Sequence, residues 1–561
     1  MLVLIVPRTK SKNKTKFIFI SGGVISGIGK GLTSASIALL LKSAGYKVAP
    51  IKLEGYLNID AGTINPIEHG DPFLCEDGTE GDMDIGSYEK FLNEDMGKAN
   101  FVTMGQVYQT ILEKERRFEY NGEDVEAVHI CDEIINRIKK VAEKGDADIV
   151  QIELGGTAGE YWNVFFYEAS RMLAFKNPGD VIHIHVSYVP TPGHLGEPKT
   201  KPTQLSVRTL NSLGIQPDFI VARAEKPLDQ RRKERFTLFC NILPEDVISN
   251  PDVDSVYRLP LILHEQNMDK RILEKLNLPL KKQDLTEWKG FIDKVVAQRK
   301  KEITVAIVGK YFGTGEYQMR DSYAALFDAI DHASTAENVK VVTKWVDAEK
   351  VEKEGAETVI GHPDGIIVPI GWGERGSEGM IASAIYAKNA KIPYLGLCFG
   401  MQLAVVAFAR DVLGWKDANS EEIDPRTKHP VIHFISSQKE LIARRAYGGT
   451  MRLGGWEAIV KKGTRAYEIY QKYGAFIDEK KGLTSERHRH RYEFNDKFAE
   501  ELEAHGLVIA ARSVKENLVE IIELLKKDHP FFLGTQGHPE YKSRPLHPHP
   551  IFLEFIKACA K

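Results

Sequence analysis

The stretch KFIFISGGVISGIGKG, residues 16–31, sets the start of the fold. Four consecutive apolar residues, Phe17–Ile20, predict a short buried strand, and a glycine-rich turn follows directly. An apolar-periodic helix is expected over about Leu32–Ala44, and a second strand over Lys47–Lys52. A strand, a loop, a helix and a strand in this order form one β–loop–α–β unit, the building block of parallel α/β sheets.

The same alternation continues along the chain and predicts two α/β domains with mostly parallel sheets. In the first half, strands are expected at Asp148–Leu154, Val181–Val189 and Asp218–Ala222. After a charge-rich stretch, strands are expected at Ile303–Val308, Val341–Val346, Gly365–Val368 and Pro393–Leu397, with a helix near Arg320–His332. We therefore predict an N-terminal extension (1–16), a first domain (17–270), a linker (271–302) and a second domain (303–561).

The composition is that of an ordinary globular protein. The 75 Lys and Arg against 78 Asp and Glu leave a net charge of −3, which argues against a globally basic nucleic-acid-binding protein. Five scattered cysteines without a Cys-x-x-Cys pair argue against a disulfide framework and a zinc cluster, and indicate a reducing compartment. The apolar residues 1–7 precede a basic stretch, which is the reverse of a secretory signal. We expect a cytoplasmic protein that binds neither nucleic acid nor membrane.

The glycine-rich turn has two interpretations. Its backbone N–H groups and the start of the next helix could bind phosphates, with Lys30 adding a positive charge. The spacing departs from the usual phosphate loop, because five residues separate Gly23 from Gly29 and Gly31 follows the lysine. A plain strand-to-helix turn therefore stays open on this motif alone.

Three other polar segments lie near expected strand ends. The stretch Asp71–Asp84 is rich in carboxylates, which suits either a solvated loop or a metal site. Glu153 ends an apolar strand just before a glycine pair, where α/β sheets bind their ligands. A carboxylate pair on Mg²⁺ with nucleotide phosphates needs this combination. The basic segment Lys199–Gln204 fits a second polyanion or an exposed loop equally well.

A different chemistry is indicated in the second half. The sequence LGLCFG, residues 395–400, has glycine two positions before and after Cys398, which is typical of a nucleophile elbow. The N–H of Phe399 would then stabilise an oxyanion. Downstream, His538 could deprotonate the thiol and Glu540 could orient the imidazole. A buried structural cysteine is the alternative for Cys398 alone, but the combination favours a cysteine nucleophile.

Together these segments resemble the CTP synthase family over about residues 17–555. The stretches that carry the resemblance are SGGVISGIGKG (21–31), IELGGT (152–157), GEPKTKPTQ (196–204), DVDSVYRLP (252–260), GLCFGMQLAVV (396–406), DANSEE (417–422), GGTMRLG (448–454), ERHRHRYE (486–493) and HPE (538–540). The resemblance implies a P-loop-like amidoligase (synthetase) domain followed by a class I glutamine amidotransferase domain with a flavodoxin-like sheet. It implies ATP-dependent amination of UTP to CTP with ammonia from glutamine, through 4-phosphorylated UTP and internal ammonia transfer.

The resemblance also implies roles residue by residue. In the glutaminase half it implies Cys398, His538 and Glu540 for catalysis, Gly371 and Phe399 for the oxyanion hole, and Gln402, Glu422 and Arg491 for glutamine. In the synthetase half it implies Gly27, Ile28, Gly29, Lys30, Gly31, Lys52 and Asp84 for ATP, Asp84 and Glu153 for Mg²⁺, and Ser26, Lys199, Lys201, Gln204, Arg235 and Glu160 for UTP or CTP. GTP as an activator, a homotetramer and filaments are further implications.

The chain departs from the family pattern at several of these places. Ile370 replaces a glycine beside the oxyanion hole, and Arg235 replaces a lysine. The segment Lys52–Tyr56 reads KLEGY where the family has KxDPY. The segment Glu160–Asn163 reads EYWN where the family contacts CTP. The aromatic rings of Tyr161 and Trp162 could stack on the pyrimidine of CTP or fill its pocket and exclude it. We expect the rings to fill the pocket, so that CTP inhibits weakly. A different amidoligase and a non-enzymatic scaffold are the competing readings of the whole chain.

Overall fold

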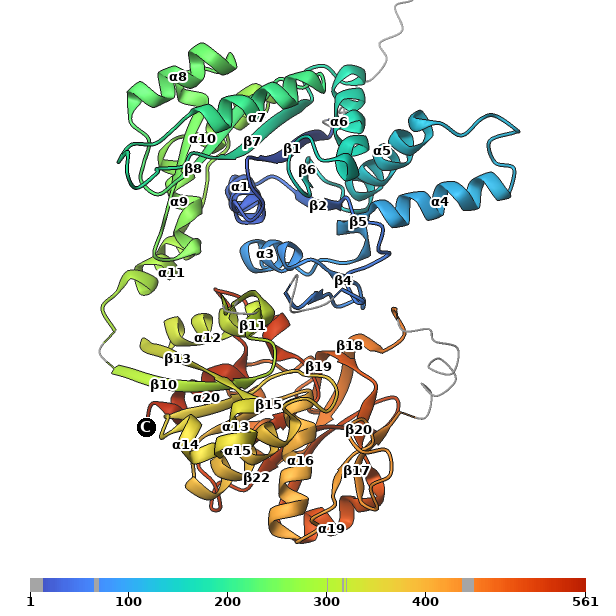
Figure 1. Cartoon of the computed structure of the whole chain (residues 1–561), viewed down its shortest axis with the longest axis vertical. Helices are drawn as coiled ribbons and strands as arrows, with labels where there is room; N and C mark the ends of the chain where they lie inside the picture. The colour runs from blue at the N-terminus through green and yellow to red at the C-terminus, as the bar shows by residue number, and fades with distance from the viewer. Residues whose placement is uncertain (1–13, 65–69, 300, 315–316, 319, 436–447) are drawn as a thin grey trace, which may run out of the picture. The chain divides into compact units, whose positions relative to one another are not determined.

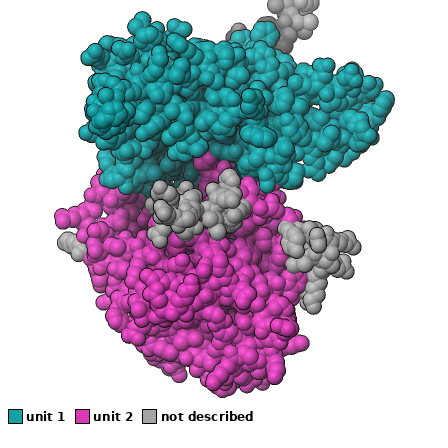
Figure 2. Space-filling view, viewed as in Figure 1, with its two compact units in different colours: residues 1–59, 87–286 teal, residues 60–86, 287–561 magenta. Residues whose placement is uncertain are grey.

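The computed structural model describes residues 14–64, 70–299, 301–314, 317–318, 320–435 and 448–561. The chain forms two compact units, which Figure 2 colours separately. Unit 1 contains residues 1–59 and 87–286, and unit 2 contains residues 60–86 and 287–561. The predicted domains are continuous ranges, whereas these units are interleaved: the acidic stretch 60–86 packs with the C-terminal half, and residues 271–286 pack with the N-terminal half.

Unit 1 is built on a seven-stranded parallel sheet in the order β5-β2-β6-β1-β7-β8-β9. Its strands are β1 (Lys16–Gly23), β2 (Val48–Glu54), β5 (Phe101–Thr103), β6 (Ile149–Leu154), β7 (Val181–Tyr188), β8 (Phe219–Ala224) and β9 (Val247–Pro251). Its helices include α1 (Lys30–Ser43), α4 (Met104–Arg116), α5 (Ala127–Lys144), α6 (Val164–Lys176), α7 (Lys201–Ser212), α8 (Gln230–Cys240), α9 (Leu259–Glu265) and α10 (Met268–Lys275). The five strands predicted in this half are confirmed.

Alternation along β1 explains why helices cover both faces of this sheet. Phe17 and Phe19 pack in a core with residues of α4, α5 and α6, whereas Ile18 and Ile20 pack in another core with residues of α1, α9 and α10. Figure 1 labels these helices. Successive side chains of a strand point to opposite faces, so a continuous apolar run is buried on both sides. This arrangement places the loops at the carboxyl ends of the strands at one edge of the sheet.

Unit 2 contains a nine-stranded mixed sheet in the order β13-β10-β14-β15-β23-β22-β21-β18-β19. Its strands are β10 (Lys301–Gly309), β13 (Val339–Asp347), β14 (Gly365–Val368), β15 (Tyr394–Leu397), β18 (Arg452–Val460), β19 (Leu483–His490), β21 (Leu507–Ser513), β22 (Val519–Leu524) and β23 (Phe532–Thr535). The strands from β13 to β23 pair in parallel, and β22, β21, β18 and β19 continue antiparallel. The four strands predicted in this half are confirmed.

Helices cover both faces of the second sheet as well. One core contains residues of α13 (Ala348–Glu354), α15 (Ser377–Ala390) and α16 (Phe399–Val412), and the other contains residues of α12 (Ala324–Ala336), α18 (Arg465–Lys472) and α20 (Pro550–Cys559). Two short strands from the acidic stretch, β3 (Phe73–Leu74) and β4 (Glu80–Gly81), pair with each other in this unit. Among the residues described, no helix combines the length and apolar character that a membrane crossing requires.

Candidate active sites

Cys398 occupies a strained turn between β15 and α16. Its φ of 51° and ψ of −101° lie outside the regions that non-glycine residues usually adopt. The two flanking glycines are required by close packing. A Cβ atom on Gly396 would lie 2.7 Å from the Gly400 backbone, and one on Gly400 would lie 1.9 Å from the Val368 carbonyl oxygen. The sequence pattern therefore predicted the turn correctly, and the turn holds the thiol at the end of the strand.

The imidazole of His538 and the carboxylate of Glu540 lie beside this thiol. His538 Nδ1 donates to Glu540 Oε1 at 2.8 Å. This hydrogen bond leaves Nε2 as the ring nitrogen that can gain or lose a proton. Burial lowers the pKa of His538, but the negative charges of Glu540 and Cys398 outweigh it and raise the pKa to about 10. The site thus favours the protonated form of the His538 imidazole.

Two further groups contact the sulfur directly. Gln536 Nε2 lies 3.4 Å from Cys398 Sγ, and the thiol lies 3.8 Å from the Arg489 carbonyl oxygen. Gln402, which the family resemblance assigns to glutamine, donates to Gln536 Oε1 at 3.2 Å and to the Tyr492 carbonyl at 2.9 Å. Gln536 was not singled out from the sequence, although it directly precedes the Gly-His-Pro-Glu segment.

The predicted oxyanion-hole residues also lie together. A Cβ atom on Gly371 would lie 3.0 Å from the Phe399 ring, so the Gly371 backbone packs against the residue that follows the nucleophile. The next glycine, Gly373, donates its N–H to Glu422 Oε1 at 2.7 Å. Burial raises the pKa of Glu422, although this hydrogen bond and the nearby Lys310 oppose that effect.

Arg491 is the other charged residue expected to bind glutamine. Its Nη2 donates to Thr450 Oγ1 at 3.0 Å.

The acidic stretch 60–86 supplies buried charges to the same unit. Arg489 donates to Glu80 at 2.6 Å and to Asp71 at 3.2 Å. Arg487 donates to Glu76 at 3.1 Å. From the sequence, this stretch was open between a solvated loop and a metal site. The structure instead pairs three of its carboxylates with arginines of the ERHRHRYE segment.

In unit 1, the glycine-rich loop and Lys30 begin helix α1. Gly27 and Gly29 have φ of 70° and 82°, which glycine adopts without strain. Lys30 Nζ donates to the Gly156 carbonyl at 2.8 Å, so this lysine lies over the turn that follows β6. Of the predicted neighbours, Ile28 is buried and Ser26 is exposed. The start of α1 carries no acidic residue, which suits an anion.

Lys52 and Glu153 form a buried ion pair on adjacent strands of this unit. Lys52 Nζ lies 2.7 Å from Glu153 Oε1 and 3.0 Å from Glu54 Oε1. Tyr88 donates to the other Glu153 oxygen at 2.5 Å. Glu153 is fully buried. Asp84, the other residue expected at Mg²⁺, lies in the first turn of α3 (Met83–Leu92), one helical turn before Tyr88, and belongs to unit 2.

The donor set fits Mg²⁺ that arrives with a nucleotide. Among the described residues there is no cluster of three or more His, Cys, Asp or Glu side chains suited to a metal ion. Mg²⁺ usually takes only one or two protein carboxylates and completes its shell with phosphate and water oxygens. A carboxylate can accept about four bonds, so the hydrogen bonds from Lys52 and Tyr88 to Glu153 do not by themselves exclude a metal bond.

Four of the six residues expected to bind UTP or CTP lie on α7, on α8 or just before α7. Lys199 pairs with Glu197, which also accepts from Arg232 of α8 at 3.0 Å. Lys201 begins α7 and is exposed, whereas Gln204 is buried and donates to Thr200 at 3.1 Å. Arg235 is exposed on α8 and stacks over the Phe239 ring at 5.7 Å.

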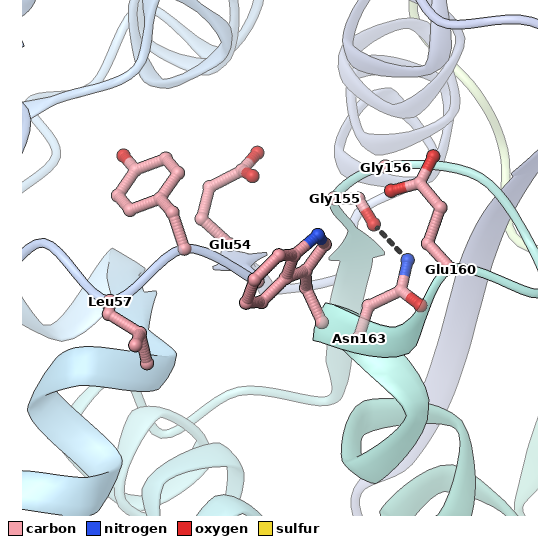
Figure 3. A pocket seen from close by; sticks show the side chains of 9 residues that line it. Glu54, Leu57, Gly155, Gly156, Glu160 and Asn163 are labelled. Carbon is pink, nitrogen blue, oxygen red and sulfur yellow. Dashed lines mark hydrogen bonds between the residues drawn. The ribbon is translucent and has the colours of Figure 1, made fainter.

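A pocket of about 400 Å³ opens between the end of β2 and the turn after β6 (Figure 3). Its lining residues are Glu54, Gly55, Tyr56, Leu57, Gly155, Gly156, Glu160, Trp162 and Asn163. Asn163 donates to the Gly155 carbonyl at 2.9 Å and fixes the turn (Figure 3). Glu160 Oε1 accepts from the Thr157 N–H at 2.9 Å. Tyr161 is 93% exposed and is not among the lining residues.

Comparison with known proteins agrees with both halves of this description. A family model described as glutamine amidotransferase class-I matches residues 318–558, and one described as CTP synthase N-terminus matches residues 16–278. The amidotransferase match covers the Cys398 turn and the His538–Glu540 pair of unit 2. The protein is therefore an enzyme with a class I glutamine amidotransferase domain joined to a synthetase domain.

Curated relatives identify the family of the whole chain. A CTP synthase of Caldanaerobacter subterraneus is 48% identical over 545 residues, which are 97% of this chain and 98% of the relative. A CTP synthase of Pyrococcus abyssi is 46% identical over 548 residues, 97% of this chain and 98% of the relative. A solved Trypanosoma brucei CTPS glutaminase domain with bound acivicin is 34% identical and covers 46% of this chain and 94% of that one, with a TM-score of 0.40. The chain belongs to the CTP synthase family, a family of ligases of pyrimidine biosynthesis.

Proposed function

We propose that this protein converts UTP to CTP with ATP and glutamine, through a 4-phosphorylated UTP intermediate and ammonia that passes internally from the glutaminase site. The observation that carries the proposal is the coexistence of two separate constellations in one chain. One is the Cys398–His538–Glu540 arrangement, and the other is Lys30 and the Lys52–Glu153 pair around the glycine-rich loop. Each constellation could act without the other, but replacement of a carbonyl oxygen by nitrogen from glutamine needs both.

In the glutaminase half, the Cys398 thiolate attacks the amide carbon of glutamine. His538 gives its proton to the leaving nitrogen, so that ammonia and a thioester form, and then takes a proton from the water that releases glutamate. The oxyanion is stabilised by the N–H groups of Gly371 and Phe399. Glu422 suits the substrate ammonium group, Arg491 its carboxylate, and Gln402 its remaining polar groups.

In the synthetase half, the ATP γ-phosphoryl group is transferred to O4 of UTP, and ammonia then attacks C4 and releases phosphate. Lys30 and the N–H groups of Gly27–Gly31 bind the ATP phosphates, and Lys52 neutralises charge that develops on O4. Glu153 and Asp84 would hold Mg²⁺, which neutralises the phosphates during transfer. Lys199, Lys201 and Arg235 supply positive charge for the UTP triphosphate, with Ser26, Gln204 and Glu160 beside them.

Internal transfer has a simple chemical reason. Ammonia in neutral water is mostly ammonium, which has no lone pair to attack C4. Delivery of the neutral molecule therefore preserves its reactivity. A homotetramer, filament formation, activation by GTP and a cytoplasmic location stay predictions from the family resemblance.

The direct test is to incubate the purified protein with UTP, ATP, Mg²⁺ and glutamine, and to measure CTP, ADP and glutamate. We expect the three products in equal amounts. Cys398→Ala should abolish CTP formation from glutamine and retain it from ammonium at high pH, because only the amide needs the thiol. Loss of both reactions in a folded Cys398→Ala protein would refute the two-site proposal. Amination of another acceptor in place of UTP would indicate a different amidoligase.

A further inference from the structure

Lys310 is a buried lysine beside the glutaminase site that no step above uses. It directly follows β10, and only 4% of its surface is exposed. Its ammonium group lies 4.6 Å from the centre of the Phe399 ring. Burial lowers the pKa of Lys310 to about 8, although the carboxylate of Glu422 opposes this effect. A lysine is seldom buried without paired groups, so its partners indicate its role.

The partners of Lys310 are two successive carbonyl groups of the oxyanion loop. Its Nζ donates to the Trp372 oxygen and to the Gly373 oxygen, both at 2.8 Å. The N–H of Gly373 donates in the opposite direction, to Glu422 Oε1 at 2.7 Å. One peptide group, Trp372–Gly373, is therefore held at its oxygen by a lysine and at its nitrogen by a glutamate.

The peptide group Ile370–Gly371 lies two peptide groups earlier in the loop and contains the predicted oxyanion donor. It is held through Tyr323. The Lys310 backbone N–H donates to the Tyr323 hydroxyl at 3.2 Å, and that hydroxyl donates to the Ile370 oxygen at 3.4 Å. A peptide group is planar and trans, so fixing the Ile370 oxygen also fixes the direction of the Gly371 N–H on the opposite side. The Lys310 side chain packs closely here as well, since a Cβ on Gly371 would lie 3.0 Å from its Cε.

These contacts matter because two glycines of the loop offer little steric resistance to rotation of its peptide groups. Gly371 and Gly373 lack side chains, and Gly373 has a φ of 69°, so a flipped peptide has little steric cost. A flipped peptide would present a carbonyl where a donor is needed. Oxyanion donors act only when they are oriented before the reaction.

We propose that Lys310 is a positioning residue of the glutaminase reaction, which locks the loop 370–373 so that the Gly371 N–H faces the developing oxyanion. The inference rests on the proposed glutaminase function. It assigns Lys310 no contact with glutamine and no proton transfer. The effect of Lys310 is therefore confined to the transition state, where the oxyanion carries charge.

The test compares Lys310→Met, which keeps an unbranched apolar side chain as far as the ε position and removes the ammonium donors, with Lys344→Met. Lys344 is the matched control, because its Nζ also donates to two successive carbonyls, those of Val359 and Ile360, both at 2.9 Å, but on the exposed side of β13. For Lys310→Met we expect the glutaminase kcat and kcat/KM to fall together by about 30- to 100-fold, with KM within about threefold of wild type. Lys344→Met should match wild type.

Two additional measurements separate positioning from damage to the site. A γ-aldehyde analogue of glutamine forms a tetrahedral adduct with the thiol, and its affinity for Lys310→Met should fall in parallel with kcat. Alkylation of Cys398 by iodoacetamide and CTP synthesis from ammonium should be unchanged. Should Lys310→Met not fold, Tyr323→Phe is expected to give the same pattern with a smaller fall. An unchanged kcat, or a raised KM with normal kcat, would overturn the inference. Absence of glutaminase activity in the wild type would instead overturn the proposed function.

Discussion

The hydroxyl of Tyr541 donates a 2.7 Å hydrogen bond to Asp71, a residue 470 positions earlier in the chain. The Tyr541 ring lies 5.3 Å from the imidazole of His538, centre to centre. Asp71 also pairs with Arg489, whose backbone oxygen contacts the Cys398 thiol. The acidic stretch 60–86 is thus part of the glutaminase unit. Through Asp71 it contacts Tyr541 and Arg489, which in turn contact His538 and Cys398.

The ion pair between Glu80 and Arg489 should be important for the stability of unit 2. Both side chains are buried, with 2% and 4% exposed, and their separation is 2.6 Å. Glu80→Gln removes one charged partner of Arg489 and leaves Asp71 at 3.2 Å as the other, so it should lower the free energy of unfolding by about 2 kcal/mol. Glu302→Gln, which breaks an exposed 2.8 Å pair with Lys340, should change it by less than about 0.5 kcal/mol. Urea denaturation of the full chain measures both variants, and equal effects would contradict the role of burial.

Reactivity of the Cys398 thiol should depend on Glu540. The raised pKa of His538, about 10, means that the imidazolium is stabilised in the folded protein and is lost as pH rises through about 10. The stability that it contributes is fully present below the ordinary histidine pKa of about 6.5 and declines between there and about 10. Glu540→Gln removes a major cause of the shift.

Iodoacetamide alkylation followed by mass spectrometry tests this dependence. At pH 7, we expect Glu540→Gln to react at least about tenfold more slowly than wild type, because each unit by which the His538 pKa falls makes the protonated imidazole beside the thiol tenfold less favourable relative to the neutral form. The alkaline limit of glutaminase activity should also move to lower pH in this variant. Cys398→Ala gives the background from other cysteines. An unchanged rate and pH profile would show that Glu540 does not set the charge of the pair.

Some features of the fold and of the glutaminase site could be predicted from the sequence and others could not, for physical reasons. Strands such as β1 were predictable because burial on both faces makes them continuously apolar, and the Cys398 turn was predictable because close packing demands two glycines. The pairing of Glu80 with Arg489 was not, because it joins residues 409 positions apart and an acidic run is usually solvated. Lys310 was missed because a single lysine after a strand carries no sequence signal that it is buried.

Glu153 provides a test of the synthetase site. Glu153→Gln keeps the shape of the side chain but removes its charge from Lys52 and from Mg²⁺. CTP synthesis from glutamine and from ammonium should both fall by at least about 100-fold, whereas basal glutamine hydrolysis should continue. Glu133→Gln is a matched control, because Glu133 is a buried glutamate paired with Lys114 at 2.7 Å in the same unit, on α5. Normal synthesis by Glu153→Gln would place the metal elsewhere.

The pocket beside Trp162 provides a test of inhibition by CTP. Our expectation of overpacking is wrong in its physical reason, because Tyr161 points away with 93% exposure and about 400 Å³ remains open. Gly55, where the family has proline, lets the aromatic residue approach: a Cβ there would lie 3.1 Å from Trp162 Cβ. The pocket thus combines an indole with the carboxylates of Glu54 and Glu160, which can accept hydrogen bonds from an amino group.

We therefore expect CTP to inhibit in competition with UTP, with its base stacked on Trp162. Stacking contributes ~1–3 kcal/mol per base, so Trp162→Ala should raise the inhibition constant for CTP by about tenfold or more. Tyr161→Ala is the matched control and should leave the constant unchanged. UTP has no 4-amino group to donate to the two carboxylates, so its KM should change less than the CTP constant in Trp162→Ala. Initial rates at fixed UTP and varied CTP measure these constants. If wild type and Trp162→Ala are equally insensitive to CTP, the base does not occupy this pocket.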